Sequence, residues 1–257
     1  MKPLIEVENL KFSYKTKQVL DDIRFSVFER DFVALTGANG AGKSTILKLL
    51  LGELTPDAGS IRLLGEDVSQ FRDWPSIGYV PQKSLVTEGR FPATAEEIVL
   101  ANLYPQIGLM RFPKKAHREK ARKALAMVGL QEEVKTLIGN MSGGQQQRVM
   151  IARVLVSEPK IMILDEPTTG IDAQTVKALY ELLARLNQEN GLTILMVTHD
   201  LARASAYVSR IFCLEEDSLL ELEKSQILDE LSHKHKHPAR EAQTAGSEGE
   251  GVGHGHS

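Results

Sequence analysis

The stretch Gly37-Ala38-Asn39-Gly40-Ala41-Gly42-Lys43-Ser44 fits the pattern G-x-x-x-x-G-K-[ST] at every fixed position. The apolar run 32–35 before it predicts a strand, and the apolar spacing after Lys43 predicts a helix that ends at Gly52. Glycines permit tight turns and close approach by an anion, at which the helix N-terminus points. The stretch therefore predicts a phosphate-binding loop, in which Lys43 reaches the β- and γ-phosphates and the Ser44 hydroxyl binds Mg²⁺.

A second pattern lies where the continuous apolar run Ile161–Leu164 meets Asp165 and Glu166. Such a run predicts a buried parallel strand, and ligands bind at the carboxyl ends of strands in open α/β sheets. Asp165 would hold Mg²⁺, directly or through water, and Glu166 would polarise the water that attacks the γ-phosphate. The alternative is an acidic pair that merely caps the next helix.

The remaining pattern places a helical segment between two regions that contain strands. Short strands are predicted within 4–36 and 60–64, and helical spacing extends from about 86 to 155. Asp172 would cap a further helix, followed by strand Thr193–Val197 and an edge strand, Ile211–Leu214. We expect an α/β fold of the P-loop NTPase (RecA-like) type, with an antiparallel β subdomain and an inserted helical subdomain, over residues 1–231.

A third motif, Ser142-Gly143-Gly144-Gln145, would open a helix over 145–156. Ser142 is a good N-cap and the two glycines would expose N–H groups, which predicts a second anion site. With the phosphate loop, this motif and the acidic pair following one another along the sequence, the chain resembles the nucleotide-binding subunit of ABC transporters over about residues 4–225. The resemblance implies an ATPase in which two identical subunits pack head to tail, so that the signature Ser142–Gln145 of each closes over the other's ATP. Met141 departs from the commoner leucine, a change that conserves volume.

Other positions take their roles from the same resemblance. Tyr14 would stack on adenine, and Gln82 would contact Mg²⁺ and connect to the helical subdomain. Asp172 matches the aspartate of the loop after the acidic strand, and His199 matches the switch histidine that contacts the γ-phosphate. The resemblance implies the catalytic set Glu166, His199 and Gln82, the Mg²⁺ ligands Ser44, Gln82 and Asp165, and the nucleotide-binding set Tyr14, Gly37, Ala38, Asn39, Gly40, Ala41, Gly42, Lys43, Ser44, Thr45, Ser142, Gly143, Gly144, Gln145 and Asp172.

Bulk composition limits the partners and the compartment. Lys and Arg total 31 against 34 Asp and Glu, so the net charge of −3 provides no broad basic surface for nucleic acid. The single cysteine, Cys213, excludes an intrachain disulfide and fits a reducing compartment. No signal peptide and no run of about 20 apolar residues is recognisable. We expect a cytoplasmic protein that is held at the inner face of the cell membrane by an integral-membrane permease.

The C-terminal segment 232–257 differs abruptly in composition, and we expect it to be disordered. It carries five of the seven histidines, which are His233, His235, His237, His254 and His256. Alternating imidazoles in an extended chain project to one side and could bind Zn²⁺. The alternative is a solvated tail or a cloning remnant with incidental histidines.

The stretch from Gln82 to Tyr104, which includes Phe91–Val99, looks most like the zinc and manganese importer branch of the family. The resemblance implies a metal importer, with zinc favoured, and an extracytoplasmic metal-binding protein in its complex. One alternative is an ABC ATPase for another cargo, such as an iron–siderophore or a lipid. Another is a soluble ABC ATPase of translation or DNA repair, which usually needs two cassettes or a long coiled-coil insertion that this chain lacks.

Overall fold

A computed structural model describes residues 2–82, 92–108, 110–215 and 218–222. Before residue 83, the elements are β1 (Pro3–Tyr14), β2 (Lys17–Phe28), β3 (Phe32–Gly37), α1 (Lys43–Leu50), β4 (Ala58–Leu63), β5 (Glu66–Asp67), the 3₁₀ helix η1 (Trp74–Ser76) and β6 (Ile77–Val80). After residue 91 they are α2 (Ala95–Ala101), α3 (Tyr104–Ile107), α4 (Lys115–Met127), the 3₁₀ helix η3 (Ile138–Asn140), α5 (Gly143–Leu155), β7 (Ile161–Asp165), α6 (Ala173–Asn190), β8 (Thr193–Val197), α7 (Leu201–Ala204), β9 (Arg210–Glu215) and β10 (Ser218–Leu222).

Strands of the N-terminal region form a four-stranded antiparallel sheet in the order β2-β1-β4-β5. Strands β1 and β2 pair as a hairpin from Pro3 opposite Phe28 to Tyr14 opposite Lys17. Both strands extend well beyond the short apolar segments that predicted them. Alternate residues of each strand face one hydrophobic cluster, as the two-residue period of a half-buried sheet requires.

A second sheet has six strands in the order β10-β9-β3-β8-β7-β6. The strands from β9 to β6 are parallel, and β10 runs antiparallel to β9. The prediction that Ile211–Leu214 forms an edge strand is therefore wrong, because β10 covers that edge. Side chains of β10 are exposed or half-buried, so the segment lacks the continuous apolar run by which a buried strand is recognised.

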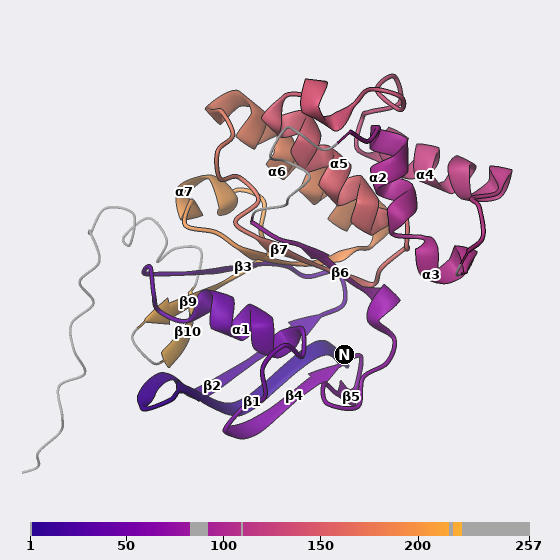
Figure 1. Ribbon diagram of the computed structural model, residues 1–257. Coiled ribbons are helices and arrows are strands. Elements are labelled where there is room, and N and C mark those ends of the chain that lie inside the picture. The colour runs from indigo at the N-terminus through magenta and orange to yellow at the C-terminus, as the bar shows by residue number, and fades with distance from the viewer. Residues whose placement is uncertain (1, 83–91, 109, 216–217, 223–257) are drawn as a thin grey trace, which may run out of the picture.

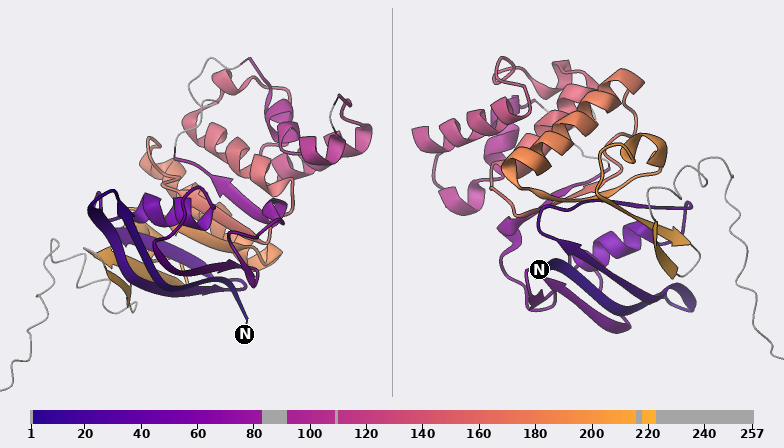
Figure 2. Two further views of the ribbon diagram at one scale, coloured as in Figure 1. Left: turned by 60° about the horizontal axis from the view of Figure 1, so that its bottom comes forward. Right: turned by 180° about the vertical axis from the view of Figure 1, so that it is seen from behind.

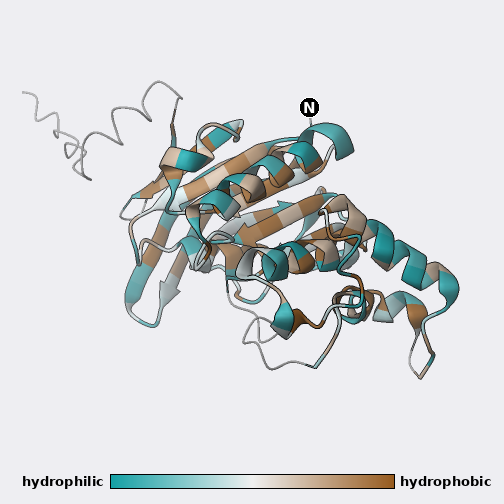
Figure 3. Ribbon diagram, turned by 90° about the horizontal axis from the view of Figure 1, so that it is seen from above, coloured by the Kyte–Doolittle hydropathy of each residue, from teal (hydrophilic) through white to brown (hydrophobic). Residues whose placement is uncertain are grey.

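The six-stranded sheet separates two hydrophobic cores. One set of alternate residues, including Val33, Ile163 and Leu195, packs with α1 and the antiparallel sheet. The other set, including Ala34, Leu164 and Met196, packs with α2, α4, α5 and α6. Figures 1 and 2 show α1 between the two sheets and the longer helices α5 and α6 on the opposite face. In Figure 3 the strands are mostly hydrophobic, whereas the helices alternate between hydrophobic and hydrophilic residues. The predicted fold class is confirmed.

Helices α2 to α5 lie in the segment that was predicted to be helical, although residues 83–91 are outside the described part. The first of these helices begins at Ala95, where Thr94 forms a reciprocal capping box with Glu97. Helix α4 also lies within this segment and buries Ala121, Ala124 and Leu125. Throughout the described ranges, every helix is too short or too polar to cross a lipid bilayer.

Candidate functional site

The phosphate loop, the acidic pair and His199 meet at one edge of the six-stranded sheet, because the strands before them are parallel neighbours. Strand β8 lies between β3 and β7, and its Val197 pairs with Leu35 on one side and Asp165 on the other. The phosphate loop follows β3, Glu166 follows β7, and His199 follows β8. This edge, formed by the carboxyl ends of the strands, is the usual ligand-binding edge of an open α/β sheet. The tertiary fold thus brings together residues that are far apart in the sequence.

The phosphate loop has a backbone that glycine adopts readily and other residues do not. Gly40 and Gly42 have φ angles of 85° and 107°, and Gly42 is the N-cap of α1 without any side-chain cap. The Nζ of Lys43 donates hydrogen bonds to the carbonyl oxygens of Gly37 and Ala38, at 2.8 and 2.9 Å. Lys43 therefore folds back across its own loop, with two of its three N–H donors used by backbone carbonyls.

The charged groups at this edge influence one another. Burial lowers the pKa of Lys43 below its ordinary value, while nearby groups, Glu166 first among them, oppose that shift. Burial raises the pKa of Asp165, and the neighbouring Glu166 raises it further. The side chain of Asp165 accepts no hydrogen bond within the described residues. A half-buried carboxylate without such a partner has its charge poorly stabilised, so a bound cation would be favourable here.

Glu166 has an unusual backbone conformation, and two side chains contact its carboxylate. Its φ of 46° lies in the left-handed region, and its N–H donates to the Val197 carbonyl at 2.9 Å. The Oε2 atom lies 2.9 Å from Nδ1 of His199 and accepts a hydrogen bond from Oγ1 of Thr169 at 3.2 Å. His199 has 60% of its side chain exposed, against 16% for Glu166. Since an ionised carboxylate only accepts, this pairing places the proton on Nδ1.

Sequence reasoning missed Thr169, which follows the acidic pair in the turn 166–170. The signal was a hydroxyl residue three positions after Glu166, a spacing at which side chains in a turn commonly bond to one another. Its role was hidden because the turn, rather than a motif, places the hydroxyl beside the carboxylate.

The other residues predicted to bind the nucleotide or Mg²⁺ differ in their exposure and position. Asn39 and Ser44 are exposed around the phosphate loop, whereas Thr45 is buried within α1. Gln82 is exposed just beyond β6, the strand that pairs with β7, and so lies toward the same edge as Asp165. Tyr14 is 44% exposed at the β1–β2 hairpin, where its ring meets Phe12 edge to face at 4.9 Å. An exposed ring on a supported hairpin is suited to stacking.

The signature turn opens α5 on the other face of the sheet. Oγ of Ser142 accepts from N–H of Gln145 at 3.3 Å, and N–H of Ser142 donates to the Gln145 side chain at 3.0 Å. Gly143 is exposed, but Gly144 is buried. Gly144 packs against Thr175 of α6. That the two glycines expose their N–H groups to an anion stays a prediction.

The phosphate loop and the signature turn are separate in this chain. The first opens α1, which packs with the antiparallel sheet, and the second opens α5, which packs with the other core. No hydrogen bond or ion pair connects the two in the described residues. Asp172 is the N-cap of α6 and accepts from N–H of Gln174 and Thr175, at 3.1 and 3.0 Å. The N-termini of α1 and α5 are therefore two separate helix starts within one chain.

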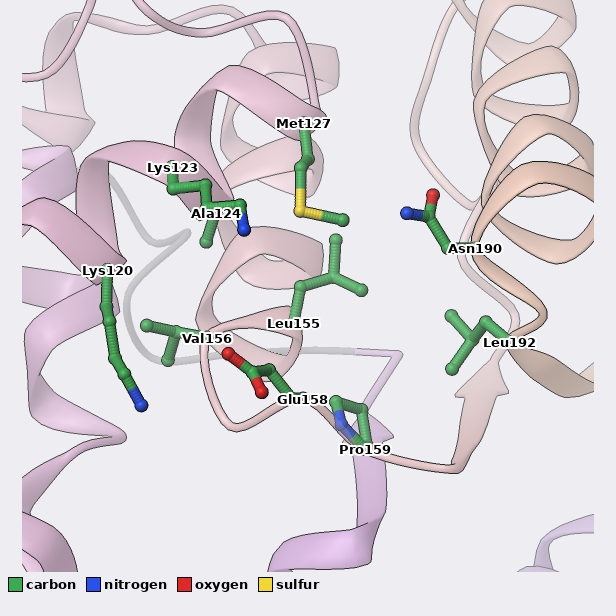
Figure 4. A pocket seen from close by; sticks show the side chains of 10 residues that line it. All are labelled: Lys120, Lys123, Ala124, Met127, Leu155, Val156, Glu158, Pro159, Asn190 and Leu192. Atoms are coloured by element: carbon green, nitrogen blue, oxygen red, sulfur yellow. The ribbon is translucent and has the colours of Figure 1, made fainter.

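A pocket of about 300 Å³ lies at the opposite, amino ends of β7 and β8. Figure 4 shows Met127 and Leu155 facing Asn190 and Leu192 across it, with Lys120 and Glu158 at a lower rim. None of the predicted site residues lines this pocket. The chemistry of the site therefore lies at the strand edge and not in this cavity.

The histidines predicted to bind zinc, from His233 to His256, lie outside the described residues. Within the described ranges, His117 and His199 are the histidines, and no group of three His, Cys, Asp or Glu side chains is arranged to hold a metal ion.

Comparison with known proteins places this geometry in a family. The profile of the ABC transporter family matches residues 20–169. The zinc uptake system ATP-binding protein ZurA of Listeria monocytogenes is 44% identical over 237 residues, which are 92% of this chain and 89% of that protein. The manganese transport system ATP-binding protein MntB of Bacillus subtilis is 42% identical and covers 82% of each chain.

Solved structures agree with the sequence relatives. The structure of cbiO1 from Clostridium perfringens, part of the ABC transporter complex cbiONQ, has a TM-score of 0.79 at 29% identity and covers 90% of this chain and 92% of that one. The dimeric ATP-binding cassette MJ0796, bound to ADP and Pi, has a TM-score of 0.70 at 29% identity, with coverages of 86% and 98%. With its phosphate loop, acidic strand and signature turn on this fold, the chain belongs to the ABC transporter family as an ATP-binding, ATP-hydrolysing subunit.

Proposed function

We propose that this chain energises the import of a divalent metal, with zinc favoured and manganese the second candidate. The observation that carries the proposal is its 44% identity, over 92% of its length, to an ATP-binding protein of a zinc uptake system. The ATP-binding protein of a manganese system is 42% identical over 82% of this chain, so the choice of zinc over manganese needs its own test.

Glu166 is the residue that we assign to the attacking water. Its Oε2 is held from two sides by His199 and Thr169, so that the carboxylate has one preferred orientation toward the strand edge. Orienting a nucleophile and stabilising charge are the main demands of phosphoryl transfer. Lys43 would stabilise the negative charge on the β- and γ-phosphates once released from its loop carbonyls. His199 would contact the γ-phosphate through its exposed ring.

Oxygen atoms at this edge fit Mg²⁺, which prefers hard oxygen ligands. Ser44, Gln82 and Asp165 are the residues that would hold it, and Asp165 has a carboxylate that lacks a hydrogen-bond donor within the described residues. The ion would neutralise phosphate charge. Tyr14 would stack on adenine, and Asp172 would lie in the loop beside the shared site.

We further propose a homodimer that docks beneath an integral-membrane permease and works with an extracytoplasmic metal-binding protein. The separation of the phosphate loop from the signature turn supports the dimer, since the two helix starts belong to different cores of one chain. The similarity to the dimeric cassette MJ0796 supports it as well. In the dimer, Ser142–Gln145 of one subunit would close over the ATP of the other.

Glu166→Gln tests the catalytic assignment. The substitution keeps shape and removes the negative charge, so ATP binding should persist while turnover falls by about 100-fold or more. An ATP-bound dimer should then accumulate, which size-exclusion chromatography with and without ATP would detect. Turnover near that of the unaltered chain would remove Glu166 from this role.

Cellular metal content tests the cargo. Deleting the gene in its own organism and measuring zinc and manganese by mass spectrometry should show a selective loss of zinc, restored by the unaltered chain but not by Glu166→Gln. Selective loss of manganese would reassign the cargo, and unchanged content of both metals would contradict metal import.

We also propose that the tail binds Zn²⁺ or a similar ion through His233, His235, His237, His254 and His256. The support is the composition of the segment alone. Calorimetric titration of the full chain and of a chain ending at residue 231 should differ at pH 7 and converge below about pH 6, where histidine protonates. Identical isotherms at pH 7 would show that the histidines are incidental.

A further inference from the structure

Gly144 has no room for a side chain, although its backbone would accept one. Its φ is not in the positive range that favours glycine. A Cβ built on Gly144 would lie 2.1 Å from Cγ2 of Thr175, far inside the 3.5–4.0 Å at which carbon atoms normally touch. The same atom built on Gly143 would find Gly170 O as its nearest neighbour, at 3.9 Å. The second glycine of the signature is therefore required by its contact with α6.

Thr175 also contacts the turn that begins α6. Its N–H donates to Oδ1 of Asp172 at 3.0 Å. The pKa of Asp172 is lower than usual because the side chain and then the backbone of Thr175 hydrogen-bond to its carboxylate. Thr175 thus serves two turns, since its backbone N–H bonds to Asp172 and its methyl carbon Cγ2 meets Gly144.

We propose that Thr175 is a positioning residue that seats the signature turn, Ser142–Gln145, against the Asp172 turn of the same chain. The two turns then meet the partner subunit as one rigid unit, because the methyl contact sets the distance between α5 and α6. This inference rests on the proposed dimer, in which the signature acts on the partner's ATP. It assigns no contact between Thr175 and the nucleotide.

The test is a rescue experiment on the full chain. Gly144→Ala should lower kcat for ATP by about 10- to 100-fold, the loss expected when a reacting group is displaced by about 1 Å. The KM for ATP should change little, because each chain retains its own phosphate loop. Adding Thr175→Ser removes Cγ2 and keeps the hydroxyl, so the double variant should return to within about threefold of the unaltered kcat.

Thr175→Val is the matched control, because valine retains a methyl group where Cγ2 lies and replaces only the hydroxyl. Gly144→Ala with Thr175→Val should remain as slow as Gly144→Ala alone. Rescue by serine but not by valine supports the inference, whereas rescue by both or by neither overturns it. Full activity of Gly144→Ala would overturn it too. An unaltered chain that fails to hydrolyse ATP would instead contradict the proposed function.

Thr175→Ala provides a second test, which does not require the Gly144→Ala variant to fold. Loss of both branches should lower kcat by about three- to tenfold with little change in the KM for ATP. Thermal unfolding of each variant separates this effect from loss of stability. An unchanged kcat in Thr175→Ala, or a fall that follows the melting temperature alone, would overturn the positioning role.

Discussion

The phosphate loop and the signature turn both open a helix with glycine-rich backbone, yet they are built in different ways. Gly42 caps α1 with a φ of 107° and no side-chain cap. Ser142 caps α5 with a reciprocal pair of side-chain hydrogen bonds, and the two glycines after it have no positive φ. In the phosphate loop Gly40 is needed for its backbone angle alone, whereas in the signature Gly144 is needed for space alone.

The difference shows how each turn is kept in place before an anion binds. The phosphate loop is held by Lys43, whose Nζ donates hydrogen bonds to the carbonyls of Gly37 and Ala38. The signature turn is already satisfied by its capping box and by packing on α6. The first turn is therefore held by a lysine side chain that crosses it, and the second by its own capping box and its packing on α6.

The largest expected effect comes from Lys43→Ala, which removes both the charge and the bonds that close the loop. ATP turnover should fall by at least about 100-fold, as when a donor to developing charge is lost. Direct binding of a fluorescent ATP analogue should weaken as well. In contrast, Ser142→Arg should block turnover while each monomer still binds ATP. Equal loss of binding in both variants would contradict the division of roles.

A mixture of these two variants sharpens the comparison. A heterodimer of Lys43→Ala and Ser142→Arg chains retains one site in which both halves are intact, so partial turnover should return on mixing. Turnover measured across mixing ratios provides the check. A complete absence of activity at every ratio would contradict the composite site.

Replacing one glycine of each turn by alanine tests whether the unfolding free energy is lost through backbone strain or through a steric clash. Gly40→Ala forces a left-handed backbone on alanine with no atom within 4 Å of the added Cβ, and it should lower the unfolding free energy by about 1–2 kcal/mol. Gly143→Ala meets neither strain nor a close neighbour and should stay within about 0.5 kcal/mol of the unaltered chain. Urea denaturation of both variants decides the matter, and equal losses would remove the distinction between the two turns.

The capping box of the signature has a matched control elsewhere in the chain. Ser142→Ala and Thr94→Ala each remove the N-cap hydroxyl of a reciprocal box, so each should cost about 1 kcal/mol of unfolding free energy. Only Ser142→Ala should also lower ATP turnover. If Thr94→Ala lowers turnover to the same degree, the effect belongs to helix stability in general.

The smallest expected effect is a pH dependence of the unfolding free energy. Of the two turns, only the phosphate loop contributes to it, because the signature turn has no ionisable side chain. Burial lowers the pKa of Lys43 below 10.5, so the unfolded chain keeps this proton to higher pH than the folded one. The unfolding free energy should therefore rise as pH increases from the folded pKa to 10.5. Subtracting the same profile for Lys43→Met isolates this contribution, and parallel profiles would contradict it.

Much of the fold followed from local pattern. The continuous apolar runs before the phosphate loop and before Asp165 predicted β3 and β7, because parallel strands are buried on both faces. Asp172 marked the start of α6, since its side chain satisfies backbone N–H groups at the helix terminus. The prediction failed at β9, whose place inside the sheet depends on a partner, β10, with a mostly exposed pattern.

By itself, the sequence determined which residues we propose for the chemistry: Lys43, Asp165, Glu166 and His199 are recognisable because each follows or ends a strand within a local motif. Only the tertiary structure decided what those residues touch. It placed Thr169 beside Glu166, the loop carbonyls beneath Lys43 and Thr175 against Gly144. The physical reason is range, since backbone angles and strand period depend on neighbouring residues, whereas strand order and helix packing depend on which distant surfaces are buried together.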